Sequence, residues 1–596
     1  MLLEPIDWAF IGGFFVLSLV VGVIVTKRAG QNTSEFFLSG RHMPWWLLGV
    51  SMVATTFSTD TPNLVTDIVR QHGISGNWEW WPFLLTGMLT VFVYAKLWRR
   101  SGVMTDVEFY ELRYSGRPAA FLRGFRALYL GVFFNVVVMA AVTLAAIKIG
   151  GVLLNLSPFW TVSIAAVVTV IYSMLGGLRG VLITDFFQFG LAMVGSVMAA
   201  KVALGLPQIG GLANLMANET VMTKINLLPD FSNKDLLVTV FIIPLAVQWW
   251  SVYYPGSEPG GGGYLVQRML AAKDEKNAVG ATLLFTVAHY ALRPWPWFIV
   301  ALCSLVIFPD IASLQAAFPD VEAGILKHDL AYPAMLTFLG PGWLGLVLTS
   351  LIAAYMSTMS TCVNWGSSYV VNDFYKRFVK PEASEKRLVM VGRFSTLVLM
   401  VVSCLLALVM SNALQMFHII MQIGAGTGLI FILRWFWWRI NAISEIVAMV
   451  VSFFIALYFQ FIHPHTGLGE LAQWQMLVIG VGITTFAWLF VTFVTRPTDE
   501  KTLRSFYRLI NPGGPGWKSV LERARADNDP VGESDGKSDL PMGILCMFFG
   551  CVAVYSAVFA SGYWIYGNYT PAVILTVTGI VSSLILIKVW GSLHVK

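Results

Sequence analysis

The stretch LIAAYMSTMSTCVNWGSSYVVND, residues 351–373, has the length of a helix, is apolar at both ends and carries hydroxyl groups in its middle. On a helix, the hydroxyls of Ser357, Thr358, Ser360 and Thr361 spread over most of one turn. Inside a membrane such hydroxyls can bond back to carbonyls of their own helix or across a tight helix contact. They can also supply oxygen ligands to a small hard cation beside a broken helix. The rest of the sequence decides between these two interpretations.

The composition predicts an integral membrane protein. Of the 596 residues, 57% are hydrophobic and only 12% are charged, which is too apolar for an ordinary water-soluble domain. A membrane-spanning helix needs roughly 20 apolar residues. We predict about fifteen such spans, at 6–26, 44–70, 76–98, 120–152, 158–175, 181–205, 236–256, 278–307, 335–375, 388–410, 414–436, 440–461, 474–495, 540–563 and 571–592.

These spans leave no room for a soluble catalytic domain, and the sequence holds no catalytic motif. There is no paired-histidine metal motif and no glycine loop after a strand that would hold a phosphate. The five cysteines all lie in apolar runs, so we expect neither a disulfide framework nor a metal site. The net charge of +6 reflects basic residues gathered in loops and does not indicate nucleic acid. We therefore predict that the protein is not an enzyme and needs no cofactor or obligate protein partner.

Charged loops predict the orientation. The segment 373–393 is rich in lysine and arginine, whereas the neighbouring loop 309–334 is acidic, so we place the first in the cytoplasm and the second outside. Arg268 is counted among the basic residues on the cytoplasmic side. The acidic start of the chain predicts a retained first helix and no cleaved signal. The N-terminus is then outside and the C-terminus inside, in a multi-pass protein expected in the plasma (inner) membrane.

Two predicted spans are interrupted in a way that lipid does not tolerate. SMVATTFSTDTPNLV in span 44–70 places hydroxyls, Asp60 and Pro62 near mid-membrane, and 236–264 contains several prolines and the run Gly260 to Gly263. Backbone freed at such breaks must be satisfied by protein or water. Each interruption lies at the start of a block of five predicted helices. Paired interruptions at corresponding positions indicate an inverted-repeat transporter.

Polar residues at three places inside predicted spans are candidates for function, and each place has a structural alternative. Asp185 is an intramembrane acid, or it pairs with Arg179 at the interface. Glu79 accepts hydroxyl hydrogens from a polar solute, or belongs with its neighbouring tryptophans to an interfacial belt. His289 and Arg293 share a helical face. They either bind a ligand or are interior groups whose hydrogen bonds are satisfied within the protein.

The chain resembles the sodium:solute symporter family. The resemblance rests on SEFFLSGRHMPWW at 34–46, GGLRGVLITDFFQ at 176–188, GYLVQRMLAAKDEKNA at 263–278 and AAYMSTMSTCVNWGSSYVVNDFYKR at 353–377. It implies an all-α polytopic protein with a LeuT-type fold, made of two inverted five-helix repeats and additional flanking helices. The divisions we expect are 1–43, 44–205, 236–436, 440–495, the cytoplasmic connector 496–540, and 541–596.

The resemblance also implies sites for Na⁺, the coupling ion. The main sodium site would consist of the carbonyls of Ala54, Phe57 and Ala354 and the hydroxyls of Ser357 and Thr358. A second site, which only part of the family has, would consist of Asp185, Ser357, Ser360 and Thr361.

For the solute, the resemblance implies a binding site of residues from several helices. Glu79 falls on a sugar-contacting glutamate of the family's sugar transporters, and Tyr254 falls on a gating tyrosine. The remaining expected contacts are Ser251, His289 and Gln422.

We therefore predict a secondary active transporter that uses Na⁺ to take up a small polar organic solute by alternating access, with a sugar or sugar derivative favoured by Glu79. The alternative solute is a carboxylate or amino acid, held by His289 and Arg293. An alternative of another class is a transporter-like sensor that binds solute without moving it, although 496–540 is short for a signalling domain.

Overall fold

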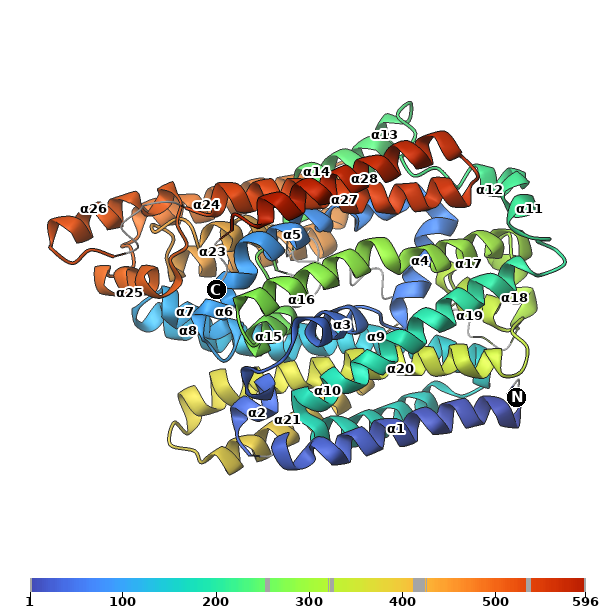
Figure 1. Ribbon diagram of the computed structural model, residues 1–596, viewed down its shortest axis with the longest axis horizontal. Helices are drawn as coiled ribbons and strands as arrows, with labels where there is room; N and C mark the ends of the chain where they lie inside the picture. The colour runs from blue at the N-terminus through green and yellow to red at the C-terminus, as the bar shows by residue number, and fades with distance from the viewer. Residues whose placement is uncertain are drawn as a thin grey trace.

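A computed structural model describes residues 3–593 apart from 30, 252–257, 320, 322–325, 411–423, 425 and 532–537. The described residues form helices joined by short loops. Figure 1 shows an elongated bundle in which long helices such as α1, α10, α20, α27 and α28 run along the long axis. The molecule is therefore built from helices packed on helices, as a membrane-spanning chain requires.

The α-helices of the first half are α1 (Pro5–Ala29), α2 (Thr33–Leu38), α3 (Trp45–Thr55), α4 (Asp60–His72), α5 (Phe83–Leu89), α6 (Ala95–Ser101), α7 (Phe109–Arg113), α8 (Gly116–Leu128), α9 (Asn135–Leu154), α10 (Pro158–Leu204), α11 (Leu212–Ala217), α12 (Glu219–Met222), α13 (Lys234–Leu237) and α14 (Ile243–Ala246). Those of the second half are α15 (Gly263–Ala271), α16 (Glu275–Val287), α17 (Pro294–Ile307), α18 (Ile311–Ala317), α19 (Ala331–Leu336), α20 (Trp343–Ser368), α21 (Glu385–Ala407), α23 (Ala442–Leu457), α24 (Gln473–Val494), α25 (Glu500–Ile510), α26 (Lys518–Ala526), α27 (Leu540–Ile565) and α28 (Tyr569–Trp590).

Ten of the predicted spans coincide with helical stretches that are long and apolar enough to cross a membrane, within the part of the chain that the structure describes. The other predicted spans fall on shorter or interrupted helices, or partly outside the described residues, as 414–436 does in its first half. The span predicted at 335–375 begins later, because α20 starts at Trp343 and a separate short helix, α19, precedes it.

The predicted interruption in span 44–70 is present. Helix α3 ends at Thr55 and α4 begins at Asp60, so the helix is interrupted over the four residues between them, in the middle of the predicted span. The predicted loop between spans 158–175 and 181–205 is instead a bend within α10, where Gly177 has φ of 52°. Glycine adopts this conformation without a side-chain clash.

Helix α20 contains the hydroxyl-rich stretch and lies in the interior, packed against α10, α1, α21 and α9. Helix α1 fixes the start of α20, because the buried Asp7 carboxylate on α1 accepts hydrogen bonds from the backbone N–H groups of Gly342 and Gly345, both at 2.7 Å. An acid at a helix N-terminus satisfies unpaired amides and complements the helix dipole.

The connector 496–540 is more than a simple linkage. Its helices α25 and α26 pack against the ends of the membrane helices, with Trp517 fully buried and its indole N–H donating to the Trp435 carbonyl at 2.9 Å. Arg113 lies over the Trp517 ring, 5.0 Å from its centre. In Figure 1, α25 and α26 lie at one end of the bundle and the N-terminus lies at the other.

Candidate functional site

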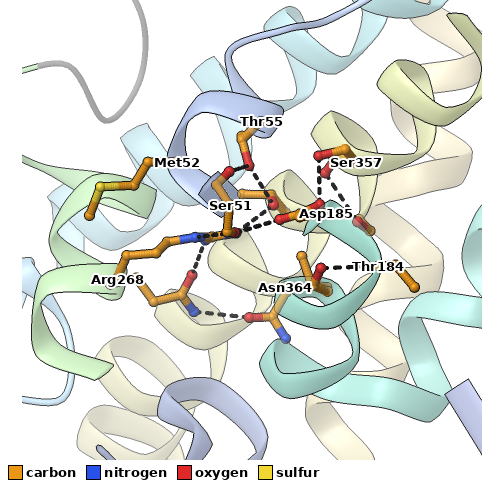
Figure 2. A network of polar contacts seen from close by, with 12 residues as sticks. Ser51, Met52, Thr55, Thr184, Asp185, Arg268, Ser357 and Asn364 are labelled. Carbon is orange, nitrogen blue, oxygen red and sulfur yellow. Dashed lines mark hydrogen bonds and ion pairs between the residues drawn. The ribbon is translucent and has the colours of Figure 1, made fainter. Parts of the chain in front are cut away.

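Asp185 is the centre of a buried polar network that joins four helices, α3, α10, α15 and α20 (Figure 2). Its side chain comes from α10 and is fully buried. The Ser357 hydroxyl on α20 donates to Asp185 Oδ1 at 2.6 Å, and the Ser51 hydroxyl on α3 donates to Oδ2 at 2.5 Å. These contacts place the carboxylate in the interior and replace the alternative of a surface pair with Arg179.

Arg268 supplies the positive charge of this network. Its guanidinium Nη2 lies 3.9 Å from Asp185 Oδ2 and donates to Thr361 Oγ1 at 2.7 Å, while Nε donates to Ser51 Oγ at 3.2 Å. The side chain, from α15, is fully buried. Grouping Arg268 with the basic residues of the loops was therefore wrong, because it lies inside the protein and its charge is neutralised by a carboxylate of another helix.

The break between α3 and α4 contacts α20 next to this network. The Thr358 hydroxyl donates to the Thr55 carbonyl at 2.8 Å, where α3 ends. Ala54 and Phe57, two of the predicted carbonyl ligands, lie on either side of this point and are buried, as is Ala354 one turn before Thr358. The Ala54 carbonyl already accepts a hydrogen bond from the Phe57 amide, at 3.1 Å.

The other two hydroxyls of the predicted second sodium site do not contact Asp185. Ser360 donates back to the Ser357 carbonyl at 3.1 Å, as the packing interpretation expects. Thr361 lies against Arg268 and against the Thr55 hydroxyl, 3.1 Å away. Among the predicted residues, the structure brings Ser357 and Asp185 into contact, and it adds Ser51, Thr55 and Arg268.

Sequence signals for the added residues were present. Ser51 and Thr55 are one turn apart in the hydroxyl-rich stretch of α3, so they share the face that meets α20. Arg268 lies in the motif GYLVQRMLAAK, where an arginine within an apolar run needs a partner. The sequence could not show that the partner comes from α10.

A second polar cluster lies on the other side of the α3–α4 break. His289 is in a π-helical turn, Ala288–Leu292, between α16 and α17, and its Nδ1 is 3.2 Å from the Thr56 hydroxyl. Arg293 donates from Nη1 to the Thr56 carbonyl at 2.5 Å, and its Nη2 is 2.7 Å from His289 Nδ1. The Trp80 ring is stacked on Tyr290, with 5.7 Å between ring centres.

Glu79 lies next to Trp80 and is half-buried. Within the described residues its carboxylate accepts no hydrogen bond, whereas its backbone carbonyl accepts one from Gln248 Nε2 at 2.7 Å. The neighbouring Trp78 and Trp81 are buried among other aromatic rings, so the interpretation as an interfacial belt is wrong. Ser251 is buried and near Gln248, while Tyr254 and Gln422 lie outside the described residues.

The family model that matches this chain is the sodium:solute symporter family, over residues 36–452. The chain belongs to this family. Like its relatives, this symporter is therefore a Na⁺-coupled transporter of a small organic solute, an integral membrane protein and not an enzyme.

The chain is similar to two curated relatives and to one solved structure. The sodium/glucose cotransporter of Vibrio parahaemolyticus is 25% identical over 77% of this chain and 86% of its own. The sodium/myo-inositol cotransporter 2 of Sus scrofa is 25% identical over 83% of this chain and 76% of its own. A substrate-bound, outward-open Na⁺-coupled sialic acid symporter, 21% identical, matches 83% of this chain and 99% of its own with a TM-score of 0.66. The LeuT-type fold predicted from the sequence is confirmed by this likeness.

The symporter's two polar clusters are joined through consecutive residues. The Thr55 carbonyl bonds to Thr358 of the first cluster, and the next carbonyl, of Thr56, bonds to Arg293 of the second. A change of backbone conformation at the break must therefore alter both clusters.

Proposed function

We propose that this symporter moves a sugar or sugar derivative together with Na⁺, and that Na⁺ binds around Ser357. The observation that carries the proposal is the meeting of the Asp185 carboxylate, the Ser357 hydroxyl and the broken end of α3 in one buried region. A hard cation is bound by carboxylate, hydroxyl and carbonyl oxygens, and these are the groups present.

Two ions would share this region. One would be held by the carbonyls of Ala54, Phe57 and Ala354 with the hydroxyls of Ser357 and Thr358. The other would lie against Asp185, with Ser357 between the two ions. Ser360 and Thr361 would complete the second site by rotating away from their present hydrogen bonds to Ser357 and Arg268.

The solute would bind at the second cluster. Glu79 is half-buried and directly precedes Trp80 in the chain, and its carboxylate has acceptor capacity available for solute hydroxyls. His289 would contribute from the opposite side, and Ser251, Tyr254 and Gln422 would complete the site. The relatives named above carry glucose, myo-inositol and sialic acid in their names, and all three are rich in hydroxyl groups.

A carboxylate or amino acid is the less supported solute. Arg293 would have to pair with its anionic group, but the guanidinium already donates to the Thr56 carbonyl and lies against His289. Recruiting it would break these contacts. A sensor without transport is also less supported, because 496–540 packs onto the membrane helices and does not form a separate domain.

We further propose that the end bearing α25 and α26 faces the cytoplasm, with the N-terminus outside, in the plasma membrane. The core would be the two inverted repeats 44–205 and 236–436, each opening at a break. Moving one charge inward then gains about 2.3 kcal/mol per 100 mV, so two Na⁺ ions could concentrate a neutral solute.

Uptake into proteoliposomes tests the proposal. We expect an inward Na⁺ gradient, compared with K⁺ at equal ionic strength, to drive accumulation of at least one labelled hexose, inositol or sialic acid. Na⁺-driven accumulation only of an amino acid, or only of a carboxylate that is not a sugar acid, would support the alternative solute. Solute binding without accumulation of any compound would support the sensor.

A further inference from the structure

A groove of about 850 Å³ opens on the outer surface between α16, the start of α3 and the end of α28. One wall is a single face of α16, consisting of Lys276, Asn277, Gly280, Leu283, Leu284 and Val287. The opposite wall comes from α28 and includes Ile587 and Trp590. Val287 is 40% exposed and Ile587 is 66% exposed, so the groove faces the surroundings and not the transport site.

The groove has a polar end and an apolar end. Lys276 and Asn277 lie on the first turn of α16, and Trp45 lies beside them at the start of α3, where its backbone N–H donates to Asn277 Oδ1 at 2.8 Å. Beyond them the walls include leucine, valine and isoleucine. From Lys276 to Val287 the helix rises about 17 Å. This is close to one leaflet's share of a hydrocarbon core of about 30 Å. Length and polarity therefore match a single lipid molecule with its headgroup at Lys276.

The charge at the polar end is positive. Lys276 and Lys273 are exposed, Lys588 lies on the last turn of α28, and Lys276 forms no ion pair with any residue the structure describes. Of the nearby acids, Glu275 is paired with Arg100 at 2.9 Å, and Asp274 caps α16 by accepting from the backbone N–H of Asn277 at 2.8 Å. Three lysines beside the single Asp274 carboxylate leave this end net positive, which favours an anionic headgroup.

We propose that this groove binds one anionic phospholipid from the leaflet at the α25–α26 end of the molecule. Its phosphate lies against Lys276, and an acyl chain lies along Leu283, Leu284 and Val287. The tryptophans Trp45 and Trp590 flank the level of the glycerol, where indole rings are favoured. The lipid would touch α3, which carries Ser51, and α16, which leads into the turn that carries His289. It would therefore bind two helices of the proposed transport site.

Native mass spectrometry of the purified, delipidated protein tests this proposal with phosphatidylglycerol and phosphatidylcholine of identical acyl chains. We expect one tightly retained phosphatidylglycerol, bound about fivefold more strongly than phosphatidylcholine. Lys276→Glu should remove this preference, and Val287→Trp, which fills the apolar end, should weaken both lipids. Lys386→Glu reverses an exposed lysine at the start of α21 and should behave like the wild type.

Equal retention of phosphatidylglycerol by Lys276→Glu and Lys386→Glu would overturn the proposal. The proposal would also be overturned if the wild type retained no lipid but formed dimers, and if Val287→Trp abolished those dimers. The groove would then be occupied by a second copy of the chain. Both variants lie at exposed positions, and circular dichroism with thermal unfolding separates loss of binding from loss of fold.

Discussion

The guanidinium Nη2 of Arg268 lies 3.9 Å from Oδ2 of Asp185, and both side chains are fully buried. The Ser51 hydroxyl connects them, since it donates to Asp185 and accepts from Arg268 Nε. Without Na⁺, Arg268 is thus the cation that balances the buried carboxylate. An ion bound at Asp185 would share this role.

Removing Arg268 should make folding depend on Na⁺. Arg268→Gln leaves Asp185 as an uncompensated buried charge, which costs about 3–5 kcal/mol of unfolding free energy in the absence of Na⁺. Thermal unfolding in NaCl and in KCl should show a larger Na⁺-induced rise in Tm for this variant than for the wild type.

Arg113→Gln is the matched control, because Arg113 is equally buried but bonds to the Arg434 carbonyl at 2.9 Å. It should lower Tm without changing the response to Na⁺. The same response of both variants to Na⁺ would argue against an ion at Asp185.

Asp185→Asn should remove one of the two proposed ions. The amide keeps the shape and can still accept from Ser357, but it lacks the charge that attracts the ion. The Hill coefficient for Na⁺ in initial uptake rates should fall from about two to about one. A variant that retains the wild-type coefficient would place the second ion elsewhere.

Glu79→Gln should weaken solute binding and leave Na⁺ binding intact. Loss of hydrogen bonds to a charged acceptor would raise the solute concentration for half-maximal uptake by roughly tenfold or more. The Na⁺-induced rise in Tm, measured without solute, should match the wild type. Wild-type uptake by this variant would contradict the proposed sugar contact.

Asp7→Ala should destabilise the contact between α1 and α20. Two backbone amides, of Gly342 and Gly345, lose their acceptor, at a cost of about 1–2 kcal/mol for a helix cap. Asp7→Asn retains an acceptor oxygen and should recover most of the Tm. An unchanged Tm in Asp7→Ala would mean that water replaces the carboxylate.

The sequence predicted the helical class, ten of the spans and the break in span 44–70, because hydropathy and interruptions are local features. It did not predict the burial of Arg268. A basic residue that is close in sequence to other basic residues is typical of a loop, and the sequence does not show that α10 packs against it. It also did not show that Ser360 points back to its own helix, because the direction of a hydroxyl depends on its neighbours in space. The docking of α25 and α26 was missed for the same reason: Trp517 is buried by Trp435 and Arg113, far away in the chain.

The most direct test of the account compares two serines of α20. Ser357 donates to Asp185, whereas Ser367, equally buried and nearly three turns later, donates to its own helix at the Val363 carbonyl at 2.6 Å. The Na⁺ concentration for half-maximal uptake should rise by roughly tenfold or more in Ser357→Ala, which loses an ion ligand, and by less than about twofold in Ser367→Ala, which loses a local bond. Equal shifts in the two variants would mean that the hydroxyls of α20 serve helix packing and that Na⁺ binds elsewhere.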